Sequence, residues 1–305
     1  HHRGAALITA VTFTFGGYLT SYPGQQLAVL EVGVWLPLIL LLVDIGLEQL
    51  GVGANGPGRF LQRSGYIMGA GLSWGVSLLA GHPQTSLYVF YTAMLYFLFS
   101  AWRYRVRWTW TAATLILFHI LGFGLAAVHV VPGLEYMRLS TRAGISFAEA
   151  AGGFARQDLL QIILPGFVSV MSPLYVGILP LLLALLAPIL RHTAQVLFWS
   201  ALALIALLVS FGGHTFVYSL FYLFVPGFGM YRSQERAAYI FSFALAVLAG
   251  YGALLLLRPL GRHTCRLFNG FCRATGYLAA GSLLLVVLNH YGWLTDEWSA
   301  DSPFG

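Results

Sequence analysis

Apolar segments of membrane-helix length follow one another along almost the whole chain. A helix that crosses a bilayer needs about 20 predominantly apolar residues, and the sequence supplies about nine such segments. With 58% hydrophobic and 9% charged residues, the chain has too little polar surface for a soluble domain. Runs such as 179–190 and 201–210 do not alternate with a period of two, which excludes a transmembrane β-barrel. We predict an all-α, polytopic transmembrane protein with about nine membrane helices.

The predicted helices form one integral membrane domain, 1–305, because no repeat of fixed period and no low-complexity linker divides the chain. Gly65 with Gly69 and Gly71 with Gly75 are small-xxx-small pairs, which allow close helix packing. The helices are expected at 5–20, 32–50, 64–80, 86–101, 109–131, 173–190, 194–211, 237–257 and 274–289.

The basic residues suggest an orientation. All sixteen are arginine, and they are dispersed among loops rather than gathered in a stripe, which argues against a nucleic-acid partner. Placing Arg103, Arg105 and Arg107 in the cytoplasm fixes the side of every other loop and puts eleven arginines inside and five outside. This positive-inside pattern predicts a cytoplasmic N-terminus and an extracytoplasmic C-terminus.

The outer loops hold most of the remaining polar residues. The loop at about 132–172 is long for a membrane connection, and 154–167 has apolar residues at the spacing of an interfacial helix. A second outer stretch, about 212–235, is aromatic-rich and broken at Pro226 and Gly227, which suits a re-entrant or interfacial segment. Any site is therefore expected on the outer face.

A polar turn at 81–85 and the segment 231–236 are the main candidates for that site. His82 can act as an acid, a base or a hydrogen-bond donor, or it can simply cap a helix. Arg142, Arg232 and Arg236 are suited to binding phosphate, although interfacial anchoring, or a structural pairing of Glu235 with an arginine, is an alternative.

Other polar residues fit a structural role as well as a functional one. Glu135 and Asp158 are outer carboxylates of the type that a general base requires, but either can be a solvated loop charge. Cys265 and Cys272 are seven residues apart with one nearby histidine, a poor zinc pattern. We predict no metal and no cofactor.

Five segments, in order over nearly the whole chain, carry a family resemblance: 35–38, 81–86, 131–142, 175–181 and 231–252. The Gly-His-Pro-Gln sequence at 81–84 is the most specific of them. Together they resemble the bacterial YfhO-type membrane proteins, which belong among the GT-C-like glycosyltransferases. The resemblance implies a GT-C-like fold in the bacterial cytoplasmic membrane. It also implies a polyprenyl-phosphate-linked sugar donor, and inverting transfer of the sugar to a cell-envelope acceptor on the outer face.

The resemblance assigns roles to the candidate residues. It also implies an acidic base in the first outer loop, whereas 21–26 carries no acid, so we expect a partial, N-terminally truncated chain that contains the binding half of a site. The alternative is a non-catalytic integral membrane subunit of a larger complex, with other integral subunits and lipids as partners. The predicted catalytic residues are His82, Glu135, Asp158 and Glu235, and the predicted substrate-binding residues are Gln84, Thr85, Arg142, Arg232, Gln234 and Arg236.

Overall fold

The computed structural model describes residues 2–21, 26–51, 63–140, 145–166, 168, 171–257 and 262–290. Every regular element in these ranges is helical, which confirms the all-α class. The elements are α1 (Arg3–Phe15), α2 (Gly17–Ser21), α3 (Leu27–Gly33), α4 (Leu36–Gly51), α6 (Gly65–Leu79), α7 (Pro83–Arg103), α8 (Trp108–Leu139), α9 (Phe147–Ala150), η3 (Arg156–Ile162), α10 (Ile178–Leu190), α11 (Ala194–Ser210), η4 (Gly212–His214), α12 (Phe216–Phe224), η5 (Phe228–Met230), η6 (Gln234–Ala237), α13 (Ala238–Leu256) and α14 (Arg262–His290).

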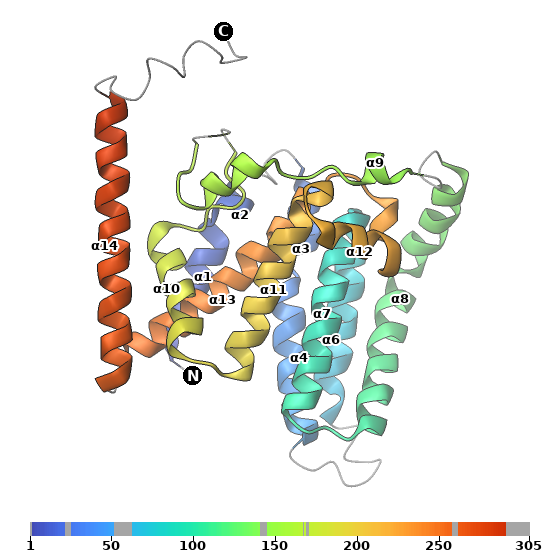
Figure 1. The fold of residues 1–305 in the computed structure, drawn as a ribbon. Coiled ribbons are helices and arrows are strands. Elements are labelled where there is room, and N and C mark those ends of the chain that lie inside the picture. Colours follow the sequence, from blue (N-terminus) through green and yellow to red (C-terminus); the bar gives the residue numbers. More distant parts are fainter. Residues whose placement is uncertain are drawn as a thin grey trace.

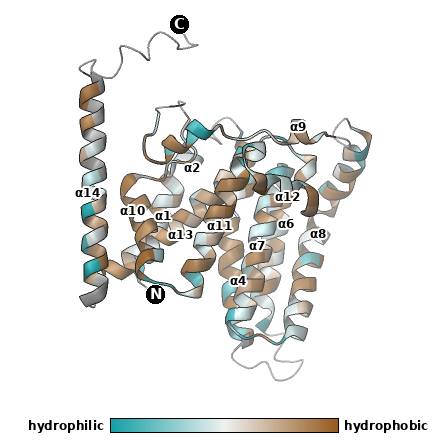
Figure 2. Ribbon diagram, in the orientation of Figure 1, coloured by the Kyte–Doolittle hydropathy of each residue, from teal (hydrophilic) through white to brown (hydrophobic). Residues whose placement is uncertain are grey.

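Among the described residues, four helical stretches are long and apolar enough to cross a membrane. They are Leu27–Gly51, Pro83–Arg103, Trp108–Leu139 and Gln234–Leu256. Three further apolar helices, α6, α10 and α11, have 13 to 17 residues, fewer than the roughly 20 that a perpendicular crossing needs. Figure 2 shows hydrophobic residues along most of the helix lengths. The structure thus has the character of a membrane protein with four candidate spans.

The helices pack as two neighbouring groups. In one group α4 contacts α6 and α7, and α6 contacts α8; in the other, α13 is surrounded by α1, α10 and α11. Helix α13 is the central element, since 72% of an 18-residue apolar stretch within Gln234–Leu256 is buried inside the protein. Helix α14 packs on α10 at the edge of the molecule (Figure 1).

Close packing of α6 against α8 depends on glycine. A Cβ atom on Gly71 would lie 2.8 Å from the carbonyl oxygen of Phe118, and one on Gly75 would lie 2.9 Å from that of Gly122. The predicted Gly71 and Gly75 pair is therefore a helix contact. The pair at Gly65 and Gly69 is not comparable, because a Cβ on Gly65 would meet nothing within 4 Å.

Several boundaries differ from those expected. Helix α7 begins at Pro83, three residues before the predicted start, because proline is favoured in the first turn of a helix, where its missing N–H costs nothing. Helix α8 continues through Pro132 to Leu139, so the outer connection begins near 140 and not at 132. The interfacial helix expected at 154–167 is a shorter 3-10 helix, η3, which spans Arg156–Ile162.

The interruption predicted at Pro226 and Gly227 is confirmed. Helix α12 ends at Phe224, and Gly227 adopts a left-handed conformation (φ 89°) that allows the chain to turn into η5. Phe216, Leu223 and Phe224 on α12 are exposed, whereas Tyr218 on the same helix is fully buried. Helix α12 therefore has an apolar outward surface, as an interfacial helix does.

Loops predicted to share one side of the membrane do share one end of the molecule. The α7–α8 and α10–α11 connections lie at one end, and α2, α9 and α12 lie at the other (Figure 1). At the first end, Nη1 of Arg63 donates to the carbonyl oxygen of Gln49 at 2.7 Å, and Gly51 packs on the backbone of Tyr104.

The α6–α8 contact makes a testable prediction. A methyl group at Gly75 must displace backbone of α8, and overpacking of this kind costs about 1–3 kcal/mol, whereas a methyl group at Gly69 meets only the end of the Leu42 side chain at 3.5 Å. Both changes give the same gain in helix propensity, so their difference reports packing. In detergent melting experiments, Gly75→Ala should lower the Tm and Gly69→Ala should not. Equal Tm values would contradict the contact.

Candidate functional site

The candidate site is at the start of α7, where the predicted polar turn lies. Gly81 has a φ of 84°, which favours glycine, and His82 is the N-cap of the helix. The backbone N–H of Thr85 donates to Nδ1 of His82 at 3.1 Å, and Oγ1 of Thr85 lies 2.8 Å from the same atom. His82 and Thr85 thus build the cap, and in this contact Nδ1 carries no proton.

Gln84 connects the polar turn to the second predicted segment. Its Nε2 donates to the carbonyl oxygen of Ser233 at 3.1 Å and to the hydroxyl of Tyr88 at 3.3 Å. Its Oε1 accepts a hydrogen bond from Nη1 of Arg236. The two polar motifs, about 150 residues apart, therefore meet at one place.

Gln234 lies at the centre of the same network and is only 1% exposed. Its Oε1 accepts from the hydroxyl of Tyr88 at 2.8 Å. Its Nε2 lies within hydrogen-bond distance of the hydroxyl of Tyr218 (3.1 Å) and of the carbonyl oxygens of Ala150 (3.1 Å) and Tyr231 (2.9 Å). The side chain ties four segments together, and all of its polar atoms have partners, as a buried amide requires.

Arg236 differs from Arg232 because its described partners are neutral. Its Nη1 donates to Gln84, and its Nη2 donates to Oε1 of Gln26 at 3.3 Å. Its Nε is buried and has no hydrogen-bond partner in the described part of the chain. Among those residues no carboxylate forms an ion pair with Arg236. A cationic group with a buried, unused donor is suited to an anionic ligand, because an unpaired buried N–H costs free energy.

Arg232 lies in a different environment. Its Nη2 is 3.8 Å from Oε1 of Glu149, and both side chains are more than half exposed. Ser146 donates to Glu149 through its backbone N–H and its hydroxyl, both at 3.0 Å. These bonds are the main cause of the lowered pKa of Glu149, and the Arg232 charge adds to them. Arg232 is therefore a surface residue that is paired, and such pairs contribute little to stability.

The other predicted residues are dispersed. Glu135 is exposed near the end of α8. Both carboxylate oxygens of Asp158 are engaged at η3, with the N–H of Ala155 at 2.8 Å and with the amide of Gln161. Glu235 is half-buried and precedes Arg236 in η6; its carbonyl oxygen accepts from the N–H of Ala238, and its carboxylate has no hydrogen bond within the described ranges. Arg142 lies outside the described residues.

Sequence reasoning missed Gln26, Tyr88 and Tyr218. Tyr88 follows Gln84 by four residues, so helical spacing alone places both on one face, and this signal was available. Gln26 and Tyr218 are joined to the site only by the fold. Burial raises the pKa of Tyr218 to about 12, so this hydroxyl stays protonated; it donates to the carbonyl oxygen of Phe228 at 3.1 Å and accepts from Gln234.

In the described part of the chain, histidine, cysteine and acidic residues do not gather in groups of three or more that could hold a metal ion. Comparison of the chain with protein-family models, with curated proteins and with solved structures gave no match. The functional argument therefore depends on the geometry of the network around Gln84, Gln234 and Arg236.

The buried network predicts that Tyr88→Phe is costly. The change leaves Oε1 of Gln234 without its donor, and an unsatisfied buried polar atom costs about 1–3 kcal/mol. Tyr91→Phe is the matched control, because that hydroxyl donates to the carbonyl oxygen of Pro226 at 2.8 Å in an exposed position, where water can replace it. Thermal unfolding should separate the two variants, and equal Tm values would mean that the hydroxyl of Tyr88 is not needed.

The lowered pKa of Glu149 predicts a local dependence on pH. The contribution of this carboxylate to α9 is complete above the ordinary glutamate range, and it is lost as the pH falls through the lowered pKa of the folded state. The protection factors of the α9 amides, that is, exchange corrected for its intrinsic dependence on pH, should therefore fall at acidic pH, and Glu149→Gln should remove that fall. Glu135→Gln, at an exposed site, should leave it unchanged.

Proposed function

We propose that the protein is a GT-C-like glycosyltransferase of the bacterial cytoplasmic membrane that uses a polyprenyl-phosphate-linked sugar. The supporting observation is Arg236, whose charge is held by the neutral amides of Gln84 and Gln26 and whose buried Nε has no described partner. A phosphate group would supply the missing acceptor and the missing negative charge. The resemblance of segments 81–86 and 231–252 to YfhO-type proteins supports the same substrate class.

The proposed reaction is in-line displacement at the anomeric carbon of the sugar. An acceptor hydroxyl attacks this carbon with inversion, the bond to the phosphate oxygen breaks, and polyprenyl phosphate leaves. Arg236 stabilises the charge that develops on the departing phosphate. Glu235 receives the proton of the acceptor hydroxyl, because it precedes Arg236 in η6 and its carboxylate has no hydrogen bond or ion pair within the described ranges, whereas Asp158 is engaged at both oxygens.

The proposed topology places this network on the extracytoplasmic side. It assigns about nine membrane helices by counting the shorter apolar helices, together with α1 and α14, as crossings. Arg103, Arg105 and Arg107 then face the cytoplasm, in agreement with the positive-inside rule, and the apolar surface of α12 lies in the outer leaflet.

The test compares three variants for retained lipid and for sugar transfer. Arg236→Ala should lower the amount of polyprenyl phosphate that co-purifies by at least about tenfold, since hydrogen bonds to charged groups are worth about 1.5–3 kcal/mol. Arg236→Lys keeps the charge but not the fork geometry, so it should restore binding only in part. Arg232→Ala, at the exposed pair with Glu149, should retain most of the lipid. Native mass spectrometry of the purified chain gives the readout, and equal lipid retention by Arg236→Ala and the wild type would refute the proposal.

A non-catalytic integral subunit is the second candidate. It is favoured by the shortage of available carboxylates, because Asp158 and Glu149 both serve as helix caps and Glu135 is exposed on α8. It predicts stoichiometric co-purification with other integral subunits and no bound lipid-linked sugar. Glu235→Gln separates the candidates: it should abolish transfer by the enzyme and should not affect assembly of a subunit.

A further inference from the structure

A cavity at the opposite end of the molecule is unrelated to the network around Arg236. It has a volume of about 620 Å³ and lies between the end of α7 and the start of α11. Binding pockets for small ligands typically measure about 300–1,000 Å³. The cavity contains two arginines and no acidic residue; its lining includes Trp102, Arg103, Arg105, Thr193, Ala194 and Gln195.

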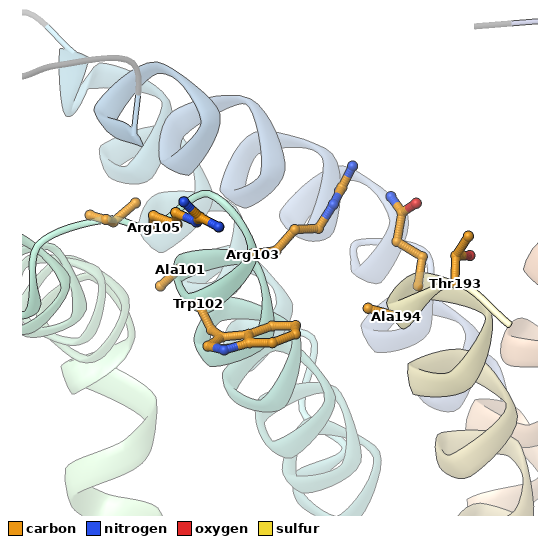
Figure 3. A pocket seen from close by; sticks show the side chains of 8 residues that line it. Ala101, Trp102, Arg103, Arg105, Thr193 and Ala194 are labelled. Carbon is orange, nitrogen blue, oxygen red and sulfur yellow. The ribbon is translucent and has the colours of Figure 1, made fainter.

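Arg103 lines this cavity, and three neighbouring side chains hold its guanidinium in place. Its Nη1 lies 3.9 Å from Oδ1 of Asp44 on α4 and donates to the hydroxyl of Tyr104 at 3.2 Å. In the amide orientation that satisfies both groups, the side-chain oxygen of Gln195 accepts from Nη1 at 2.7 Å and from Nη2 at 2.9 Å. Figure 3 shows Arg103 reaching from α7 toward the start of α11, where Thr193 is the N-cap.

Arg105 is the second cation of the cavity, and its guanidinium has no described partner. This side chain is exposed and forms no hydrogen bond or ion pair with any residue that the structure describes. The φ of 54° at Arg105 belongs to the end of α7, where the N–H of Arg105 donates to the carbonyl oxygen of Trp102 and the N–H of Val106 donates to that of Ala101 in a Schellman motif. In the same cavity the backbone N–H groups of Ala194 and Gln195 belong to the first turn of α11, where helix geometry provides no partner.

The tryptophans around this turn indicate its depth in a membrane. Trp102 is 69% exposed and Trp108 is 80% exposed, and the three arginines of the turn lie between them. Exposed tryptophan at the end of an apolar helix is typical of the headgroup level of a bilayer. Beside Trp102, Phe99 of α7 stacks on Phe198 of α11 with 4.4 Å between ring centroids, so the chain surface next to the cavity is apolar.

We propose that this cavity binds the phosphate headgroup of an anionic phospholipid. Arg105 and the free N–H groups at the start of α11 contact the phosphate, Arg103 holds the wall of the cavity in place through Asp44 and Gln195, and the acyl chains lie along Trp102, Phe99 and Phe198. The ligand is an anionic lipid because the lining is cationic without an acid, and because the cavity opens beside an apolar helix surface at headgroup depth. The lipid would join α7 to α11. This inference does not depend on glycosyl transfer.

The test is a lipid titration of the purified full chain, read by native mass spectrometry. Phosphatidylglycerol and phosphatidylcholine are the probes, since they have the same acyl chains available and differ in headgroup charge. Arg105→Ala should weaken binding of phosphatidylglycerol about fivefold, because one arginine near a lipid surface contributes roughly that factor. Arg107→Ala is the control, since this arginine is in the same turn but does not line the cavity, and it should change binding by less than about twofold.

Three results would overturn the proposal. Equal weakening by Arg105→Ala and Arg107→Ala would show diffuse attraction to charge in place of a defined site. Equal binding of the two lipids by the wild type would show that the headgroup charge is not recognised. Displacement of the lipid by millimolar inorganic phosphate would show a site for free phosphate. The guanidinium of Arg105 has no described partner, and alanine keeps the backbone N–H that donates to Trp102, so the Tm of Arg105→Ala without lipid should equal that of the wild type. A lower value would likewise contradict the proposed role.

Discussion

The buried amide of Gln234 is the interaction on which the arrangement of α7, α9, α12 and η6 depends. Through one side chain it joins Tyr88 on α7, Tyr218 on α12, the end of α9 and the segment that precedes η6. Apolar packing alone does not fix how these short elements sit relative to one another, since hydrophobic contacts have no direction. Hydrogen bonds do have direction, and a buried amide with all of its partners present specifies one arrangement. The position of Arg236 beside Gln84 follows from that arrangement.

The two ends of the molecule hold their arginines in different ways. Arg103 lies near the carboxylate of Asp44, which offsets part of its charge within the protein. Arg236 has only amide oxygens, so its hydrogen bonds orient the guanidinium without neutralising it. A neutralised arginine stabilises the junction of helices, whereas an oriented and uncompensated one retains its attraction for an anion. This contrast, more than the number of arginines, distinguishes a structural from a binding role.

The sequence predicted most helices well, because long apolar runs allow few alternatives. It also predicted that the segments around Gln84 and Gln234 belong to one face. Both are polar loops, and the number of predicted membrane helices between them places the two loops on the same side. It could not predict the pairing of Arg236 with Gln26, because contacts between distant side chains depend on the packing of whole helices. His82 shows another limit: a histidine before proline fits both a catalytic group and an N-cap, and only the distance to Thr85 distinguishes the cap. Pro132 shows a third, because α8 continues past a residue that usually ends a helix.

Helix α12 connects an apolar outward surface to the polar network around Gln234. Its outward surface is apolar and needs a lipid boundary, whereas its single buried hydroxyl, on Tyr218, completes the bonding of Gln234. In a bilayer, the burial of this apolar surface in lipid and the completion of the polar network would therefore occur together, since both require α12 in the same position.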